Sequence, residues 1–176
     1  MKNDARKIVL VSGAPGAGKT TLARALADEL GFSLVTKDNI KETLFDALDG
    51  PAGDLQFSRK IGRAAMELIW MLAERCPDVI LEANFRPRGQ YERAKIAALS
   101  GHLVEVYCSC PIEECVRRYN ERSEGGRRHD AHVVRTITTE TLAEYGEPVG
   151  IGHVIQVDTK SLAEEIREAF GRLAHD

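Results

Sequence analysis

The segment Gly13–Thr20 constrains this chain more than any other part of its sequence. It reads G-x-x-x-x-G-K-T, it follows the apolar run Ile8–Val11, and it precedes a stretch with helical spacing that begins at Thr21. In this strand–loop–helix context the pattern is typical of a phosphate-binding P-loop. Its glycines let backbone N–H groups turn toward an anion, and the N-terminus of the following helix favours the same negative charge.

Individual residues of this segment predict a nucleotide site with magnesium. Lys19 can reach the β- and γ-phosphates, and the Thr20 hydroxyl can ligate Mg²⁺. We therefore predict ATP and Mg²⁺ as cofactors. A glycine-rich turn that binds nothing is the alternative, and the flanking strand and helix disfavour it. The predicted nucleotide-binding residues are Gly13, Ala14, Pro15, Gly16, Ala17, Gly18, Lys19, Thr20 and Thr21.

Length and composition fit one compact domain, which we expect to cover residues 1–176. A chain of 176 residues with 43% hydrophobic and 29% charged residues can bury a sizeable core. The net charge of −3 gives no bulk attraction to nucleic acid or membranes. No apolar run approaches the ~20 residues of a membrane span, and no signal core is seen, so we expect a cytoplasmic protein, monomeric by default. The four cysteines lack the paired spacing of zinc sites and are expected to be reduced.

Apolar runs alternate with stretches of helical spacing along the chain. This alternation predicts an α/β fold with a mostly parallel sheet that helices cover on both faces. Ligands of such sheets bind at the carboxyl ends of the strands. Strands are expected over residues 7–12, 32–36, 78–83, 102–108 and 154–157, and helices over 18–30, 38–48, 55–75, 89–99, 111–123, 131–145 and 161–173.

Two residues after the second predicted strand are candidates for the acceptor side of a phosphoryl-transfer site. Asp38 would lie near the mouth of the P-loop, where a carboxylate can accept the proton of an attacking hydroxyl. It also opens a predicted helix, so a role as N-cap is the structural alternative. Lys41 lies one helical turn later and could bind an anionic group of the acceptor or point to solvent.

Glu82 and Asn84 follow the third predicted strand. A carboxylate at the position of Glu82 can hold a water on Mg²⁺, as a Walker B acid does, so we predict Thr20 and Glu82 as the metal-side residues. Asn84 is predicted to contact the acceptor, and Phe85 with the turn that follows it to form one wall of the acceptor pocket. A structural role is the alternative for these last residues, since turns also use Asn and Pro.

Four arginines gather around the helix predicted to end near residue 123. Arg118 and Arg122 are four residues apart and share one helix face, and Arg127 and Arg128 follow two glycines. Guanidinium groups suit the charge that spreads over a transferring phosphoryl group. We therefore predict an arginine-rich lid over residues 118–132, with Arg127 and Arg128 toward the substrate. A solvated basic helix end is the alternative.

Four segments together resemble the small P-loop kinases that are often described as AAA-type predicted kinases. The relatives of this family include polynucleotide kinase, chloramphenicol phosphotransferase, zeta toxins, gluconate kinase and adenylate kinase. The resemblance covers nearly the whole chain, and it implies a three-layer P-loop NTPase fold with a five-stranded parallel sheet of order 2-3-1-4-5. The segments are V-S-G-A-P-G-A-G-K-T-T-L-A, T-K-D-N-I-K, I-L-E-A-N-F and C-V-R-R-Y-N-E-R.

The resemblance also implies roles for single residues. Asp38 matches an acceptor-side base, and Lys41 stands where polynucleotide kinase has a substrate-binding arginine. Glu82 and Asn84 match an acid and an asparagine after the third strand, although Lys41 and Glu82 depart from the commonest residues of the family. Arginines at the entry to the lid and the residues after the last strand are implied as contacts of adenine and phosphates: Arg118, Arg122, Val157, Asp158 and Thr159.

Together these features predict an ATP-dependent, Mg²⁺-assisted kinase that transfers the γ-phosphate to a hydroxyl of a small molecule or nucleotide. Three alternatives remain: a polynucleotide 5′-hydroxyl kinase, a zeta-like toxin that phosphorylates a sugar nucleotide, and a nucleotide-dependent ATPase or switch. The absence of an N-K-x-D segment disfavours a GTPase. The predicted catalytic residues are Lys19, Asp38, Arg118 and Arg122.

Overall fold

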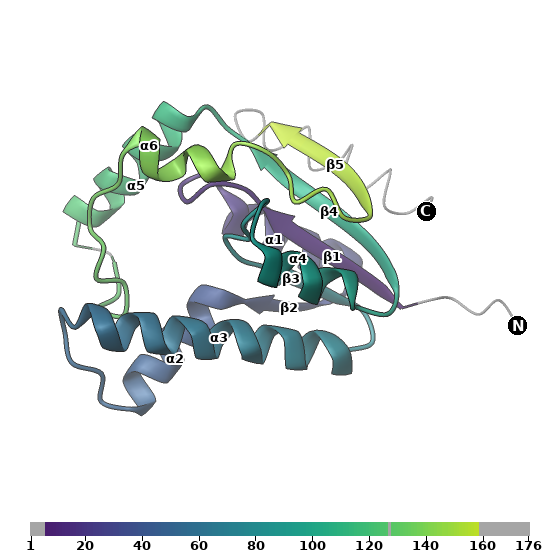
Figure 1. Cartoon of the computed structure of the whole chain (residues 1–176), viewed down its shortest axis with the longest axis horizontal. Helices are drawn as coiled ribbons and strands as arrows, with labels where there is room; N and C mark the ends of the chain where they lie inside the picture. The colour runs from purple at the N-terminus through teal and green to yellow at the C-terminus, as the bar shows by residue number, and fades with distance from the viewer. Residues whose placement is uncertain (1–5, 127, 159–176) are drawn as a thin grey trace, which may run out of the picture.

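A computed structural model describes residues 6–126 and 128–158 of the chain. Its centre is a five-stranded sheet of order β2-β3-β1-β4-β5, in which all neighbouring strands are parallel (Figure 1). This is the fold class and strand order predicted from the sequence. The helix predicted over residues 161–173 lies outside the described residues. The strands are β1 (Lys7–Ser12), β2 (Ser33–Thr36), β3 (Val79–Glu82), β4 (His102–Ser109) and β5 (His153–Asp158).

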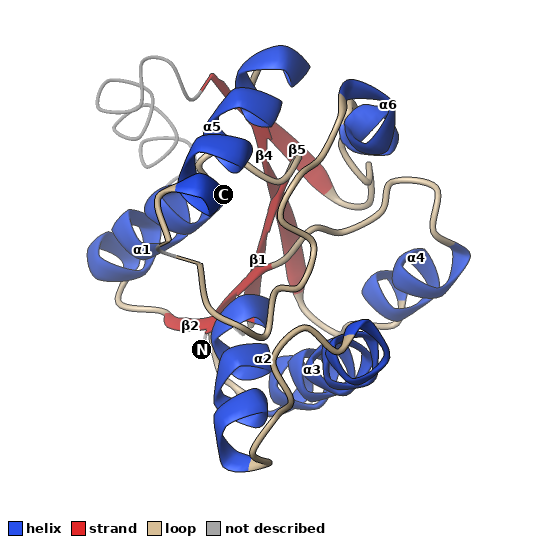
Figure 2. Cartoon of the chain, turned by 90° about the vertical axis from the view of Figure 1, so that its left-hand side faces the viewer, coloured by secondary structure: helices blue, strands red, loops and turns tan. Residues whose placement is uncertain are grey.

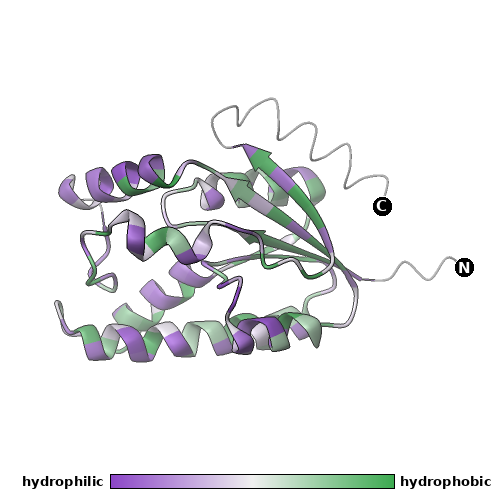
Figure 3. Ribbon diagram, turned by 45° about the horizontal axis from the view of Figure 1, so that its top comes forward, coloured by the Kyte–Doolittle hydropathy of each residue, from purple (hydrophilic) through white to green (hydrophobic). Residues whose placement is uncertain are grey.

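Helices cover both faces of the sheet, with α1 and α5 on one side and α3 and α4 on the other (Figure 2). Alternate residues of β1 divide between the two cores: Val9 and Val11 pack toward α1 and α5, and Ile8 and Leu10 toward α3 and α4. Both sides of β1 are therefore apolar, whereas exposed and buried residues alternate along most of β5. Hydrophilic and hydrophobic residues are mixed along the helices (Figure 3). The helices are α1 (Lys19–Leu30), α2 (Lys37–Ala47), α3 (Leu55–Arg75), α4 (Gln90–Ala97), α5 (Ile112–Glu124) and α6 (Thr139–Leu142).

The start of α2 differs from the prediction in a way that matters for the site. Thr36, not Asp38, is the N-cap, and its Oγ1 accepts a hydrogen bond from the Asn39 N–H at 3.4 Å. Asp38 therefore lies within the first turn of the helix, where a carboxylate is favoured by the helix dipole but is not needed as a cap. The structural alternative for Asp38 is thus wrong.

The helix predicted over residues 131–145 is also wrong. Residues 131–138 are irregular, and only α6 and a 3-10 turn, Ala143–Tyr145, follow. The segment 133–139 is rich in Val, Ile and Thr, whose branched side chains lose rotamer freedom in a helix. The apolar spacing that suggested a helix instead places Ile137 and Leu142 in the core beside α5.

The carboxyl ends of the neighbouring strands β2, β3 and β1 reach the same edge of the sheet. Glu82 at the end of β3 pairs with Val11 on one side and with Thr36 on the other. The P-loop, the first turn of α2 and Asn84 therefore all begin at this edge, as expected for ligand sites of parallel sheets. None of the described helices combines the length and apolar character needed to cross a bilayer.

Candidate nucleotide and acceptor site

The loop between β1 and α1 has a backbone shape that depends on glycine. Gly13 and Gly16 have φ angles of +129° and +89°. A Cβ on Gly13 would lie 2.7 Å from the Cys108 carbonyl oxygen, and one on Gly16 would collide with the carbonyl of Cys115. The loop is therefore held closely against β4 and α5, with no room for a side chain on its inner side.

Lys19 begins α1 and lies beneath this loop. Its side chain is buried, and Nζ donates a hydrogen bond to the Ala14 carbonyl at 2.9 Å. Burial lowers the pKa of Lys19, although the nearby carboxylates of Glu82 and Asp38 act in the opposite direction. The ammonium group is thus confined to the loop, at the place where the phosphates of a nucleotide would lie.

The hydroxyl of Thr20, on α1, and the carboxylate of Glu82, at the end of β3, lie close together. Thr20 Oγ1 donates to Glu82 Oε2 at 3.3 Å, and burial raises the pKa of Glu82 while Lys19 lowers it. Within the described residues, no cluster of three His, Cys, Asp or Glu side chains could hold a metal by itself. Such a pair of hard oxygen donors fits Mg²⁺, which usually keeps several waters and substrate phosphates as its other ligands.

A cavity of about 220 Å³ opens beside the loop and collects most of the predicted site residues. The Asp38 side chain is exposed there, and no hydrogen bond or ion pair within the described part of the chain engages its carboxylate. Asn84, after β3, also lines the cavity. The lining residues are Pro15, Gly16, Gly18, Lys19, Thr20, Thr21, Asp38, Glu42, Glu82, Asn84, Tyr119, Arg122, Arg128, His129 and His132.

The structure separates the predicted lid arginines. Arg122 and Arg128 line the cavity. Arg118 lines a neighbouring, more open pocket with Gly16, Gly18 and Arg122, and its Nε donates to Glu114 at 2.7 Å. The Arg128 guanidinium stacks 4.0 Å from the centre of the Tyr119 ring. Its Nε is buried without a hydrogen-bond partner in the described structure, and such an unmatched donor fits a phosphate. Arg127 lies outside the described residues.

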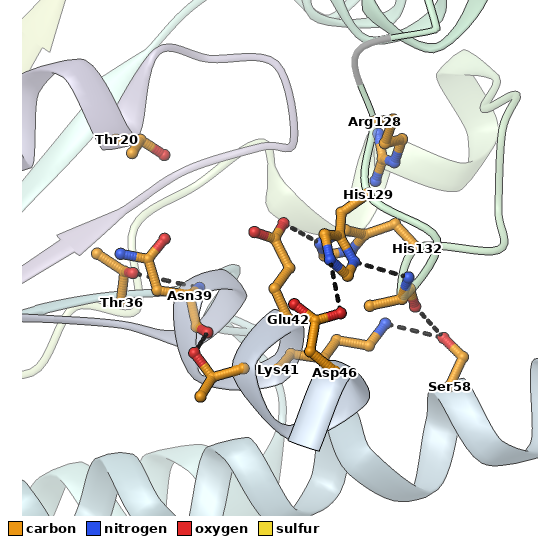
Figure 4. Close-up of polar contacts among 12 residues, drawn as sticks. Thr20, Thr36, Asn39, Lys41, Glu42, Asp46, Ser58, Arg128, His129 and His132 are labelled. Atoms are coloured by element: carbon orange, nitrogen blue, oxygen red, sulfur yellow. Dashed lines mark hydrogen bonds and ion pairs between the residues drawn. The ribbon is translucent and has the colours of Figure 1, made fainter. Parts of the chain in front are cut away.

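Sequence reasoning missed an acid–histidine layer that closes one side of the cavity (Figure 4). His132 Nε2 lies 2.8 Å from Glu42 Oε1, and His129 Nε2 lies 3.2 Å from Asp46 Oδ1. Burial lowers the pKa of His132 even though Glu42 and Asp38 favour its charged form. Glu42 lies one helical turn after Asp38, so helical spacing could have predicted that both acids share one face of α2. Its histidine partner is 90 residues away in sequence, and no local pattern predicts that contact.

Residues 128–132 lie against α2 and α3. The Ser58 hydroxyl on α3 donates to the Ala131 carbonyl at 2.7 Å, and Ala131 packs with Phe45 and Ile61. The His129 ring also meets the Phe45 ring edge-on, with 5.6 Å between their centres. The segment after α5 is therefore joined to the helices that follow β2, and it links the predicted lid to the acceptor side.

A second cavity, of about 690 Å³, lies on the other side of Asn84. Lys41 faces this cavity, not the one that contains Asp38, and its Nζ donates to Ser58 Oγ at 2.9 Å. Phe85, predicted as a pocket wall, is instead buried and packs against Trp70. The cavity is lined by Lys37, Lys41, Leu55, Ser58, Arg59, Gly62, Arg63, Met66, Glu67, Asn84, Arg86, Tyr91, Glu92, Val134 and Tyr145.

Asp158 is exposed at the carboxyl end of β5, at the same edge of the sheet as the P-loop. Val157 before it is buried in the core that α1 and α5 cover. These residues therefore lie at the edge of the sheet where the P-loop begins. Their contact with adenine stays a prediction. Thr159 lies outside the described residues.

The sequence and the fold both match known proteins. A family model named AAA_33 and described as an AAA domain matches residues 8–148. A cytidylate kinase from Ignicoccus hospitalis is 30% identical over 127 residues. That match covers 65% of this chain and 64% of the kinase, so the chain spans less than two thirds of that relative's length.

Solved structures with the same fold include two described as kinases. A candidate kinase from Chloroflexus aurantiacus is 25% identical with a TM-score of 0.77, over 94% of this chain and 97% of that one. A shikimate kinase from Acinetobacter baumannii, solved with shikimate, has a TM-score of 0.64 over 98% and 95% of the two chains. At 16% identity, the second likeness concerns the fold alone.

Proposed function

Because this chain belongs to the AAA_33 family, whose model matches most of its length, we propose that it is an ATP-dependent phosphotransferase acting on a small molecule or nucleotide. The observation that carries this proposal is one cavity that brings together the P-loop lysine, an oxygen pair suited to Mg²⁺ and the unengaged carboxylate of Asp38. A nucleotide-binding loop alone would support many functions. The carboxylate beside it favours transfer to an acceptor.

In the proposed reaction, Lys19 and the main-chain amides of residues 13–20 bind the ATP phosphates. Asp38 accepts the proton of the acceptor hydroxyl while that oxygen forms a bond to the γ-phosphorus. The bond from this phosphorus to the bridging oxygen of the β-phosphate breaks, and ADP leaves. Arg122 and Arg128 neutralise charge on the transferred group. Thr20 and Glu82 would hold Mg²⁺, which supplies further charge neutralisation for the β- and γ-phosphates when bound.

The remaining predicted residues belong to the edges of this proposed site. Arg118 would contact the nucleotide from the more open pocket beside Gly16, and Asp158 would lie near the adenine. Asn84 would orient the acceptor, since it lines both cavities. Arg127 remains a substrate-side candidate from sequence alone.

A nucleoside monophosphate is a second candidate acceptor, since the relative from Ignicoccus hospitalis is described as a cytidylate kinase. Its accepting atom would be a phosphate oxygen, which carries no proton at neutral pH that must be removed by a base. Replacing Asp38 by Asn would then have little effect on kcat. The same substitution should strongly slow transfer to a hydroxyl.

Transfer of labelled γ-phosphate from ATP to a panel of acceptors tests the proposal. The panel should include hydroxy acids, sugars, nucleosides, nucleoside monophosphates and a 5′-hydroxyl oligonucleotide, with a reaction lacking acceptor to measure simple hydrolysis. Asp38→Asn is the test variant, and Asp28→Asn, an exposed residue of α1, is the matched control. Transfer that Asp38→Asn abolishes and Asp28→Asn preserves supports the proposal. ATP hydrolysis alone, unaffected by Asp38→Asn, contradicts it.

A further inference from the structure

The second cavity carries a strong excess of positive charge. Its lining includes five basic side chains and only two acidic ones, Glu67 and Glu92. This local charge contrasts with the net charge of −3 of the whole chain. The basic residues are Lys37, Lys41, Arg59, Arg63 and Arg86.

Arg86 Nε lies 3.8 Å from Glu144 Oε2, but most of the basic side chains of this cavity have no ion-pair partner among the described residues. Glu67 accepts a hydrogen bond from Tyr91 and lies 3.5 Å from Lys95, a cation outside the cavity lining. In the part of the chain that the structure describes, no ion pair engages Lys37, Arg59 or Arg63. Three cations that gather in one cavity without a paired carboxylate are the arrangement expected of an anion-binding site.

Lys41 adds a geometric reason to place an anion here. Its Nζ donates a hydrogen bond to Ser58 on α3 (Figure 4). Basic side chains of both α2 and α3 line the same cavity. Burial and the neighbouring charges of Lys37 and Arg128 lower the pKa of Lys41 to about 8, against the opposing effect of Asp38 and Glu42. A bound anion would offset this repulsion.

The second cavity lies next to the proposed reaction site. Asn84 lines both cavities, and the first turn of α2 places Asp38 in one and Lys37 in the other. An acceptor whose hydroxyl lies at Asp38 can therefore extend past Asn84 into the basic cavity. Its carbon skeleton would meet the apolar part of the lining, which includes Met66 and Tyr91.

We propose that the acceptor of this enzyme carries an oxyanion, a phosphate or a carboxylate, which Lys41, Arg59 and Arg63 bind in the second cavity while its hydroxyl lies at Asp38. This inference rests on the proposed phosphotransferase function and narrows its substrate class. Neutral sugars, nucleosides and alcohols would lack the group that orients them. Arginine suits this task because its planar donors match both carboxylate and phosphate.

Binding of inorganic phosphate tests the cavity without catalysis. The protein is first saturated with a non-hydrolysable ATP analogue and Mg²⁺, so that the P-loop is filled, and the arginine Nε–H signals are followed by NMR as phosphate is added. Sodium chloride of equal ionic strength corrects for screening. The test variant is R59Q/R63Q. The control, K60Q/R75Q, removes the same charge from exposed positions of α3 outside the cavity.

We expect saturable shifts of the Arg59 and Arg63 signals in wild type. Because R59Q/R63Q lacks these signals, phosphate binding to the variants is measured by titration calorimetry; it should be about tenfold or more weaker in R59Q/R63Q and within about twofold of wild type in the control. Phosphate that acts no differently from chloride, or that binds R59Q/R63Q as tightly as wild type, overturns the inference. Phosphate that shifts the Nε–H signal of Arg75, outside the cavity, but not those of Arg59 and Arg63 does the same.

Matched acceptors then connect the cavity to the reaction. The kcat/KM is measured for glucose and gluconate, for shikimate methyl ester and shikimate, and for ribose and ribose 5-phosphate. A preference for the charged member that R59Q/R63Q removes supports the inference, and the pairs distinguish carboxylate from phosphate. Equal kcat/KM for both members overturns it and leaves the phosphotransferase proposal standing. Phosphate binding in the cavity without transfer to any compound upholds the anion site and counts against the phosphotransferase.

Discussion

Replacing Glu105 by glutamine is expected to lower the free energy of unfolding by about 2 kcal/mol. Glu105 lies within β4, is fully buried, and accepts three hydrogen bonds. Ser12 Oγ and the Val149 N–H donate to Oε1 at 2.5 and 2.8 Å, and the Gly150 N–H donates to Oε2 at 2.8 Å. The carboxylate thereby connects residues 149–150, which precede β5, to β4 and β1 of the sheet.

The size of this effect follows from the number of acceptors that remain. A glutamine amide keeps one oxygen for Ser12 and Val149, but it turns an NH₂ group toward the Gly150 N–H. Losing one hydrogen bond to a charged group costs about 1.5–3 kcal/mol. In a chain of this length, 2 kcal/mol corresponds to a decrease in Tm of about 4–8 °C. Glu105→Ala removes both acceptor oxygens, and with them all three hydrogen bonds, and should cost more, about 4 kcal/mol.

Urea unfolding followed by circular dichroism measures the change, with Glu113→Gln, an exposed acid in the first turn of α5, as the control. The control is expected to stay within about 0.5 kcal/mol of wild type. The reasoning is refuted if Glu105→Gln shows a change as small as the control, because the buried carboxylate would then not be held by the bonds described.

Four further predictions concern residues of the two cavities. Lys19→Ala should weaken MgATP binding about 10- to 100-fold through the loss of an ammonium–phosphate contact, and an unchanged Kd in titration calorimetry contradicts this. Asp38→Asn should lower kcat for a hydroxyl acceptor about 10²- to 10⁴-fold with little change in the Kd of MgATP. Steady-state kinetics at saturating acceptor measures this effect, and an unaltered kcat would show that another group is the base. Lys41 has a pKa of about 8, so it loses its positive charge as pH increases through this value, and the KM for an anionic acceptor should rise. Lys41→Met should remove that pH dependence. A KM that stays constant with pH in wild type argues against an anion at Lys41. Because this pKa is below the ordinary lysine value of 10.5, the unfolded chain binds the proton more tightly. The stability of wild type relative to Lys41→Met should therefore increase from pH 8 toward 10.5 in urea titrations.

Local patterns explain why the sheet and the P-loop could be predicted from the sequence. The alternation of apolar runs with helical spacing fixes which segments are strands, and the motif Gly13–Thr20 fixes which strand edge holds the loop. The helix α3 extends over Leu55–Arg75, the same residues that its spacing predicted. The strand order came from the family resemblance, since spacing alone contains no information on which strands are neighbours.

Contacts between distant residues explain what the sequence could not provide. The partners of Glu105 lie 93, 44 and 45 residues away, and no local signal distinguishes this acid from a solvated one. His132 and Glu42 are likewise brought together only by the docking of residues 128–132 on α2 and α3. The position of Lys41 depends on how α2 packs against α3, so its cavity could not be separated from that of Asp38 before the fold was known.

The most direct measurement records the backbone amide signals of isotope-labelled protein by NMR while MgATP is added. If the amides between β1 and α1 bind a triphosphate, the signals of residues 13, 14 and 16–20 will shift together and saturate with a single Kd; Pro15 has no N–H. Shifts that are absent from these residues, or that do not saturate, would contradict the account, whatever activity the protein proves to have.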